Sequence, residues 1–233
     1  MRRLLLLALL TGTLSACGSS DDGGKTAEIP SGGAAATAPA ATAPEPAASG
    51  GCRQIAQAPK PKPDGGEKKP SKPLDASKTW TLDFDTSCGR FTVTLDLKRG
   101  PNASASMVSL AKAGFFRNTT FHRIVPDFVI QGGDPTAQGS GGPGYSTVDK
   151  PPPGTAYTKG VVAMAKTPTE PLGTAGSQFY VVTGADAGLP PQYAVLGRVT
   201  KGMSTVDRIG ALGDASEQPT QVVILYDVKA NAR

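Results

Sequence analysis

Residues 79–97 read TWTLDFDTSCGRFTVTLDL, a stretch in which apolar and polar residues alternate in two successive runs. Trp80, Leu82 and Phe84 alternate with polar residues in the first run, and RFTVTLDL repeats the pattern after the turn TSCG. A period of two places every second side chain on the same face of a β-strand. The stretch therefore predicts a β-hairpin with one buried face.

Beyond the hairpin, the chain contains short apolar runs separated by loops rich in Gly and Pro. FHRI, FVIQG, GVVAMA, QFYVV, AVLGRV and the final PTQVVILYDVK each indicate a strand. Pro101 begins an apolar pattern with helical spacing that stops at Gly114, and residues 203–212 predict a second helix. Many short strands without regular strand–helix alternation favour a mainly β domain, an antiparallel barrel or sandwich, with the helices at the ends of a barrel.

Residues 18–77 differ in composition from the rest of the chain. The segments SGGAAATAPAATAPEPAASGG and PKPKPDGGEKKPSKP are rich in Ala, Pro, Gly and Lys, and every aromatic residue lies at Trp80 or later. Such a segment buries too little apolar surface to offset the entropy of ordering it. We therefore expect a disordered linker over 18–77 and one globular domain over 78–233, which is long enough to form a core.

The first 17 residues, MRRLLLLALLTGTLSAC, indicate an export signal. Two arginines precede an apolar run that is too short to span a bilayer. The ending Leu14–Cys17 resembles a bacterial lipobox, in which the cysteine is acylated. We therefore expect an exported lipoprotein, anchored through Cys17 to the outer face of the cell membrane. The alternative is an ordinary cleaved signal with an incidental cysteine.

The remaining cysteines form an even set. If Cys17 is acylated, Cys52 and Cys88 are left, and exported proteins fold in compartments that favour disulfides. A bridge between them would join the end of the linker to the turn TSCG of the hairpin. The alternative is two free thiols.

Composition and motifs disfavour several other classes of function. The net charge of +5 falls to +3 without the two signal arginines, and basic residues are not interleaved with aromatic ones, so nucleic acid is not an expected partner. Gly139–Gly144 matches G-x-G-x-x-G, but Pro143 and the following DKPPPG prevent the helix that a dinucleotide site requires. His122 is the only histidine, which disfavours a metal site. We expect no cofactor, and a structural hydrogen bond for the His122 ring.

Four longer motifs together resemble one known family. FHRIVPDFVIQGGDPTAQGSGGPGY (121–145), GVVAMAKT, GTAGSQFYVVTG and AVLGRVTKGM are similar to motifs of the cyclophilin-type peptidyl-prolyl cis-trans isomerases, in the same order and at the same spacing. The likeness covers nearly all of 79–230. It implies an eight-stranded antiparallel closed barrel capped by two α-helices, with a substrate groove on the outside of the barrel. It also implies catalysed rotation about Xaa-Pro peptide bonds.

The resemblance assigns roles to individual residues of that groove. Arg123 would stabilise the twisted peptide bond, Gln131 would hydrogen-bond the substrate backbone, and Phe128 would hold the proline ring. The other expected substrate contacts are the pocket residues Val129, Met164, Tyr180 and Leu189, the rim residue Tyr193, the main-chain contacts Ala165 and Lys166, and Gln178 along the groove.

Four positions depart from the common family pattern. Gly188 stands where many members have tryptophan and Tyr193 where many have histidine, while Val129 replaces a commoner methionine and Lys166 a commoner asparagine. These departures affect the expected binding of the cyclic peptide cyclosporin, which we predict to be weak, more than the expected catalysis.

The expected function is therefore isomerisation of Xaa-Pro bonds by a monomer that assists the folding of exported, proline-containing polypeptides. The first alternative is a non-catalytic module that binds proline-containing partners through the same groove. The second is a hydrolase using His122, which the absence of a G-x-S-x-G motif disfavours.

Overall fold

The computed structural model describes residues 51–233, and its barrel begins with the predicted hairpin. β1 (Trp80–Thr86) pairs antiparallel with β2 (Gly89–Leu95), and Phe84 lies directly opposite Phe91. The two rings stack with their centroids 4.5 Å apart, on the buried face. The alternation of apolar and polar residues thus produces the one-sided hairpin expected from it.

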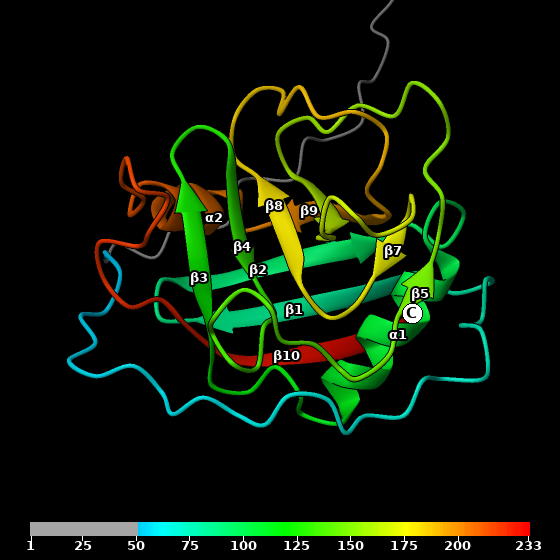
Figure 1. The fold of residues 1–233 in the computed structure, drawn as a ribbon, viewed down its shortest axis with the longest axis horizontal. Coiled ribbons are helices and arrows are strands. Elements are labelled where there is room, and N and C mark those ends of the chain that lie inside the picture. Colours follow the sequence, from blue (N-terminus) through cyan, green and yellow to red (C-terminus); the bar gives the residue numbers. More distant parts are fainter. Residues whose placement is uncertain (1–50) are drawn as a thin grey trace, which may run out of the picture. The chain divides into compact units, whose positions relative to one another are not determined.

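Eight strands close into an antiparallel barrel in the order β1-β10-β3-β4-β8-β6-β9-β2 (Figure 1). The closed barrel confirms the fold that the sequence predicts. A separate ribbon pairs β5 (Thr147–Val148) with β7 (Thr174–Ala175). The other barrel strands are β3 (Thr119–Val125), β4 (Val129–Gly132), β6 (Val161–Met164), β8 (Phe179–Val182), β9 (Val195–Lys201) and β10 (Ile224–Ala232).

Side chains fill the interior of the barrel. Phe179 of β8 lies among three other rings, with centroids 5.2 Å away at Phe84, 6.1 Å at Phe121 and 6.3 Å at Phe116. All four side chains are buried. Because these rings occupy the inside, the outer surface of the barrel is the part that remains open to a ligand.

Both predicted helices are present and cover the barrel from different sides (Figure 1). α1 (Pro101–Lys112) begins with proline. Proline has no N–H, and it suits the first helical turn because N–H groups there have no acceptor within the helix. Gly114 follows the helix with a φ of 71°, the left-handed conformation that favours glycine after a helix end. α2 (Met203–Gly210) buries Val206 and Ile209.

Residues 51–77, here called the N-terminal strap, correct the prediction of a disordered linker for this part of the chain. The strap contains no helix or strand, but Cys52 forms a disulfide with Cys88, and the sulfur atoms lie 2.02 Å apart. The prediction considered only the apolar surface within the segment itself. Contacts with distant parts of the chain order the strap instead. Four backbone N–H groups of the strap donate hydrogen bonds of 2.8–3.0 Å to the domain: Arg53 to Ser87, Lys62 to Pro135, Gly65 to Gly142, and Glu67 to Pro143.

The predicted signal peptide with Cys17, and linker residues 18–50, lie outside the described residues. Among the helices of 51–233, none combines the length and the apolar character that crossing a membrane requires.

Candidate active site

A β-bulge decides the direction in which Arg123 points. Phe121 of β3 pairs with Gly132 of β4, but Arg123 pairs with Gln131, so one extra residue stands between the two pairs. A bulge of this kind changes the alternation of side chains between the two faces. Phe121 and Ile124 therefore both lie in the barrel core, whereas Arg123 lies on the outer face beside Gln131.

Three neighbours hold the guanidinium group of Arg123. Its Nε donates a hydrogen bond of 2.8 Å to Oε2 of Glu217, and its Nη1 lies 3.5 Å from Oε1 of Gln131. The guanidinium carbon lies 6.0 Å from the centre of the Phe128 ring, within the range of cation–π attraction. The Arg123 side chain is 31% exposed, so the charged group remains accessible from solvent.

Gln131 connects Arg123 to a second glutamine. Nε2 of Gln131 donates to Oε1 of Gln178 at 3.0 Å. Nε2 of Gln178 in turn donates to the carbonyl oxygens of Gly139 at 3.0 Å and Gly141 at 2.9 Å. These contacts orient both side-chain amides, and they form a polar row from Arg123 to the glycine-rich loop.

A pocket of about 310 Å³ opens beside this row. Its apolar wall belongs to a second apolar cluster, separate from the barrel core, in which Val129 and Tyr180 are buried. The structure thus brings together all but two of the expected active-site residues. The pocket is lined by Arg123, Phe128, Val129, Gln131, Ala165, Lys166, Tyr180, Leu189 and Tyr193.

The two exceptions are Met164 and Gln178. The prediction that Met164 lines the proline pocket is wrong, because its side chain is fully buried in the barrel core. Its neighbour Ala163 belongs to the outer cluster instead, as the alternation along β6 requires. Gln178 lines an adjoining hollow that it shares with Asp64 of the strap, and it contacts the pocket residues Gln131 and Ala165 through hydrogen bonds.

His122 does not make the expected hydrogen bond. Both ring nitrogens are buried, and neither has a partner among residues 51–233. Burial lowers the pKa of His122 below its ordinary value of 6.5, although the carboxylate of Asp134 acts in the opposite direction. The prediction of a structural hydrogen bond is therefore wrong, and the ring is held neutral by its surroundings.

Three tyrosines build one wall of the pocket. Tyr180 and Tyr193 line it with their rings edge to face, 5.6 Å apart, and the fully buried Tyr157 packs against both. The Tyr157 hydroxyl donates to the Tyr193 carbonyl at 2.7 Å and accepts from the Tyr193 N–H at 3.0 Å. These two bonds fix the loop that carries Tyr193. Burial raises the pKa of both Tyr157 and Tyr180 above 10.0, so their hydroxyls stay protonated.

Glu217 is a site residue that the sequence analysis missed. It lies 94 positions from Arg123, in the loop between α2 and β10. No motif or periodicity connects the two positions, so the sequence contains no signal for their ion pair. The period-two alternation of GVVAMA, by contrast, would have placed Ala163 in the outer apolar cluster and Met164 on the opposite face.

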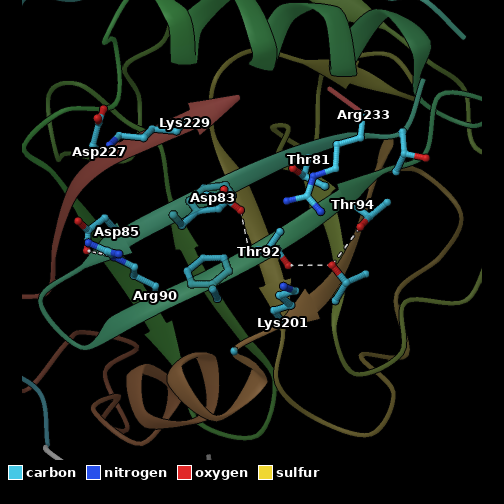
Figure 2. Close-up of a pocket in the computed structure, with 15 residues that line it drawn as sticks. Thr81, Asp83, Asp85, Arg90, Thr92, Thr94, Lys201, Asp227, Lys229 and Arg233 are labelled. Atoms are coloured by element: carbon cyan, nitrogen blue, oxygen red, sulfur yellow. Dashed lines mark hydrogen bonds and ion pairs between the residues drawn. The ribbon is translucent and has the colours of Figure 1, made fainter. Parts of the chain in front are cut away.

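A larger hollow, of about 550 Å³, lies on a different face of the barrel, along β1, β2, β9 and β10 (Figure 2). It contains none of the expected site residues. Polar side chains there pair with one another: Thr92 donates to Asp83 at 2.7 Å, and Arg90 lies 3.4 Å from Asp85. The smaller pocket beside Arg123 is therefore the candidate active site, because the expected site residues gather there.

Known proteins with similar sequences belong to one family. The family model described as cyclophilin type peptidyl-prolyl cis-trans isomerase/CLD matches residues 81–230. Peptidyl-prolyl cis-trans isomerase-like 1 of Aspergillus fumigatus is 38% identical over 138 residues, which cover 58% of this chain and 84% of that protein. The Bos taurus protein of the same name is 34% identical over 149 residues, covering 62% of this chain and 88% of that protein.

Solved structures share the fold. A cyclophilin type peptidyl-prolyl cis-trans isomerase of Cryptosporidium parvum matches with a TM-score of 0.61 and 27% identity, covering 66% of this chain and 99% of that one. Its structure in the presence of the dipeptide Ala-Pro matches with a TM-score of 0.60 and 28% identity, with the same coverage of both chains. With the family match, the sequence identities and the barrel in agreement, the chain belongs to the cyclophilin-type peptidyl-prolyl cis-trans isomerases.

Proposed function

We propose that this isomerase catalyses rotation about the Xaa-Pro bond through Arg123. The rotation is opposed by a barrier of about 18–20 kcal/mol, because the C–N bond has partial double-bond character. In the twisted state the lone pair of the proline nitrogen is no longer delocalised and can accept a hydrogen bond. A guanidinium donor directed at this nitrogen stabilises the twisted state more than either planar state, which lowers the barrier.

The arrangement of the guanidinium group is the observation that carries this proposal. Glu217 engages Nε, whereas the terminal nitrogens make only the long Nη1 contact with Gln131 among the described residues. N–H donors therefore remain for a substrate at the edge of the pocket that Arg123 lines. Rotation breaks no covalent bond, so no nucleophile is required.

Catalysis also requires that the proline ring be held while the preceding residue turns. Phe128, Leu189 and Tyr193 present partly buried apolar surfaces around the pocket. Burying the ring against them stabilises the complex by about 25 cal/mol for each Å² of apolar surface removed from water. We assign the ring to this pocket, and Gln131, Ala165 and Lys166 to the peptide backbone. The Ala-Pro dipeptide used with the Cryptosporidium parvum relative is a suitable first ligand.

The isomerisation proposal is tested by measuring the rate of cis-trans exchange of an Ala-Pro-containing peptide with and without the purified chain. We expect the exchange to accelerate in proportion to protein concentration. Binding of the peptide without any acceleration would instead support a non-catalytic module that binds proline-containing partners.

We propose weak binding of cyclosporin as a property of the same groove. Gly188 has a φ of 61°, and a Cβ built there would meet no atom within 4 Å. The position is thus open to solvent and provides no aromatic wall for the drug. Gly188→Trp is expected to strengthen inhibition by cyclosporin, provided that the loop relaxes from its left-handed conformation. Equal inhibition of both proteins would mean that position 188 does not contact the drug.

We further propose that the enzyme is exported, anchored by lipid at Cys17, and assists the folding of exported proteins. The lipobox-like ending of the N-terminal segment supports this proposal, as does the Cys52–Cys88 disulfide, since disulfides persist in oxidising compartments. One acyl chain binds membranes only marginally, whereas two anchor a protein stably. Cys17→Ser should therefore move the protein from the membrane fraction to the soluble fraction. An unchanged distribution would contradict the lipid anchor.

A further inference from the structure

The loop that carries Glu217 is closed by its own hydrogen bonds. Oδ1 of Asp214 accepts from the N–H of Ser216 at 2.8 Å, from its hydroxyl at 2.6 Å, and from the N–H of Gln218 at 3.1 Å. The Asp214 N–H donates to the carbonyl of Gln218, and the Glu217 N–H donates to the carbonyl of Asp214, each at 3.1 Å. The turn 214–218 therefore has a defined shape, and Glu217 is held within it.

Glu217 meets strand β3 at two successive residues. Its carbonyl oxygen accepts from the N–H of Ile124 at 3.1 Å, and its carboxylate accepts from Nε of Arg123 at 2.8 Å. Glu217 makes these contacts from a φ of 64°, the left-handed region that residues with a side chain rarely occupy. The backbone bond to Ile124 thus fixes where the turn lies, and the carboxylate acts from that fixed position.

We propose that Glu217 is a positioning residue for catalysis, and this inference rests on the proposed role of Arg123. A guanidinium group is planar, so a bond at Nε together with the contact against Phe128 defines both its position and its plane. With Nε occupied, the terminal nitrogens are directed to the pocket side. A free arginine side chain would sample many rotamers, and only a fraction of them would direct a donor at the proline nitrogen.

The solvent exposure of the Arg123–Glu217 ion pair allows a positioning role of Glu217 to be distinguished from a structural role. Arg123 is 31% exposed and Glu217 is 50% exposed, and ion pairs in contact with water contribute little to folding stability. Removing the carboxylate is therefore expected to change the catalytic rate while the melting temperature stays near that of the wild type. A purely structural residue would produce the opposite pattern.

Two substitutions distinguish the carboxylate from the turn. Glu217→Gly removes the carboxylate and tolerates the positive φ without strain, so the turn keeps its shape. Glu217→Gln keeps an acceptor oxygen of the same reach but removes the charge. Asp85→Asn is the matched control, because it breaks an exposed pair with Arg90 on the far face from the pocket.

The experiment measures kcat, KM and melting temperature for isomerisation of an Ala-Pro-containing peptide by each full-length variant. We expect Glu217→Gly to lower kcat roughly tenfold with KM nearly unchanged, at the lower end of the effect of hydrogen-bond partners that orient functional groups in metal sites. Glu217→Gln is expected to keep most of the rate, and Asp85→Asn all of it. If Glu217→Gly folds poorly, Glu217→Asn replaces it, since asparagine also tolerates the left-handed region.

A double substitution provides the decisive result. If Glu217 acts through Arg123, adding Glu217→Gly to Arg123→Ala causes no further loss of kcat, because the group that it orients is already absent. A further loss in the double variant, or a wild-type kcat in Glu217→Gly, would overturn the proposal. Full activity of Arg123→Ala by itself would instead overturn the proposed role of Arg123, so the two failures are distinguishable.

Discussion

Removal of the Cys52–Cys88 disulfide should release the N-terminal strap and leave the barrel folded. The perturbation is the double substitution Cys52→Ser and Cys88→Ser, with chemical reduction of the wild type as a second route. The bridge joins positions 36 residues apart, so it closes a loop of about 37 residues. For that length the chain-entropy model gives about 4 kcal/mol at 25 °C.

This magnitude is compared with the bonds that hold the strap. Its four backbone hydrogen bonds to the domain together contribute roughly 2–6 kcal/mol, at about 0.5–1.5 kcal/mol each. Without the disulfide the strap is attached to the barrel at one end only. Ordering it then costs about 4 kcal/mol more in chain entropy, which offsets most of the stabilisation from the four hydrogen bonds. The barrel strands pair without the strap and are expected to persist.

Amide hydrogen exchange is the assay that resolves the two parts. In the bridged protein, the amides of Arg53, Lys62, Gly65 and Glu67 should be protected by their bonds to the domain. Without the bridge they should exchange rapidly, while barrel amides such as that of Met164, which donates to Ala194 at 2.9 Å, keep their protection. The fall in melting temperature should not exceed about 8–16 °C, the equivalent of 4 kcal/mol in a domain of this size.

Two results would refute the reasoning. If the four strap amides stay protected without the bridge, the hydrogen bonds hold the strap by themselves and the disulfide is dispensable. If the Met164 amide loses protection as well, the strap and the barrel unfold as one unit, and the barrel does not stay folded without the bridge.

Three further predictions concern single residues of the domain. Tyr180→Phe should stabilise the protein by about 1 kcal/mol, seen as a higher denaturant midpoint, because the buried Tyr180 hydroxyl has no hydrogen-bond partner among residues 51–233; a lower midpoint would show that it has one. Burial by itself would raise the pKa of Asp134, but hydrogen bonds from Thr136 and Gly139 outweigh it and hold the pKa below 3.8. Asp134 therefore contributes stability above about pH 4, and this contribution is lost as pH falls through the lowered pKa. In a plot of unfolding free energy against pH, Asp134→Asn should make the acid side less steep. The substitution should also cost about 1–3 kcal/mol of stability at pH 7. An acid limb as steep as the wild type's would contradict this. Phe128→Ala should act mainly by raising KM, as peptide titrations will show, and a change confined to kcat would argue against its hold on the ring.

Much of the fold could be predicted from local patterns. The alternation in 79–97 specifies the hairpin, because every second side chain must enter the core, and Pro101 and Gly114 mark the ends of α1 through their backbone conformations. Closure of the barrel could not be derived in this way, because strand order depends on pairs far apart in the sequence. The resemblance to a family supplied the closed eight-stranded barrel, and the structure confirms the barrel.

The sequence could predict most of the residues that belong to the site, but it could not predict the face of the barrel to which each side chain points. Alternation along FHRI leaves the direction of Arg123 open, and a bulge that no sequence pattern announces directs it outward. Met164 was placed in the pocket by resemblance alone, whereas the alternation of β6 sends it into the core. Glu217 and the strap share one cause of failure, since both are held by contacts with residues distant along the chain.

The central claim is that Arg123 stabilises the twisted Xaa-Pro bond, and the most direct measurement is kcat/KM of Arg123→Ala for an Ala-Pro-containing peptide. We predict a fall of about 10²–10³, the effect of losing one preorganised donor. Arg123→Lys should also be poor, because an ammonium group cannot reproduce the planar fork of the guanidinium. The melting temperature should barely change, since the side chain lies at the surface. A folded Arg123→Ala variant that retains the wild-type kcat/KM would contradict the claim.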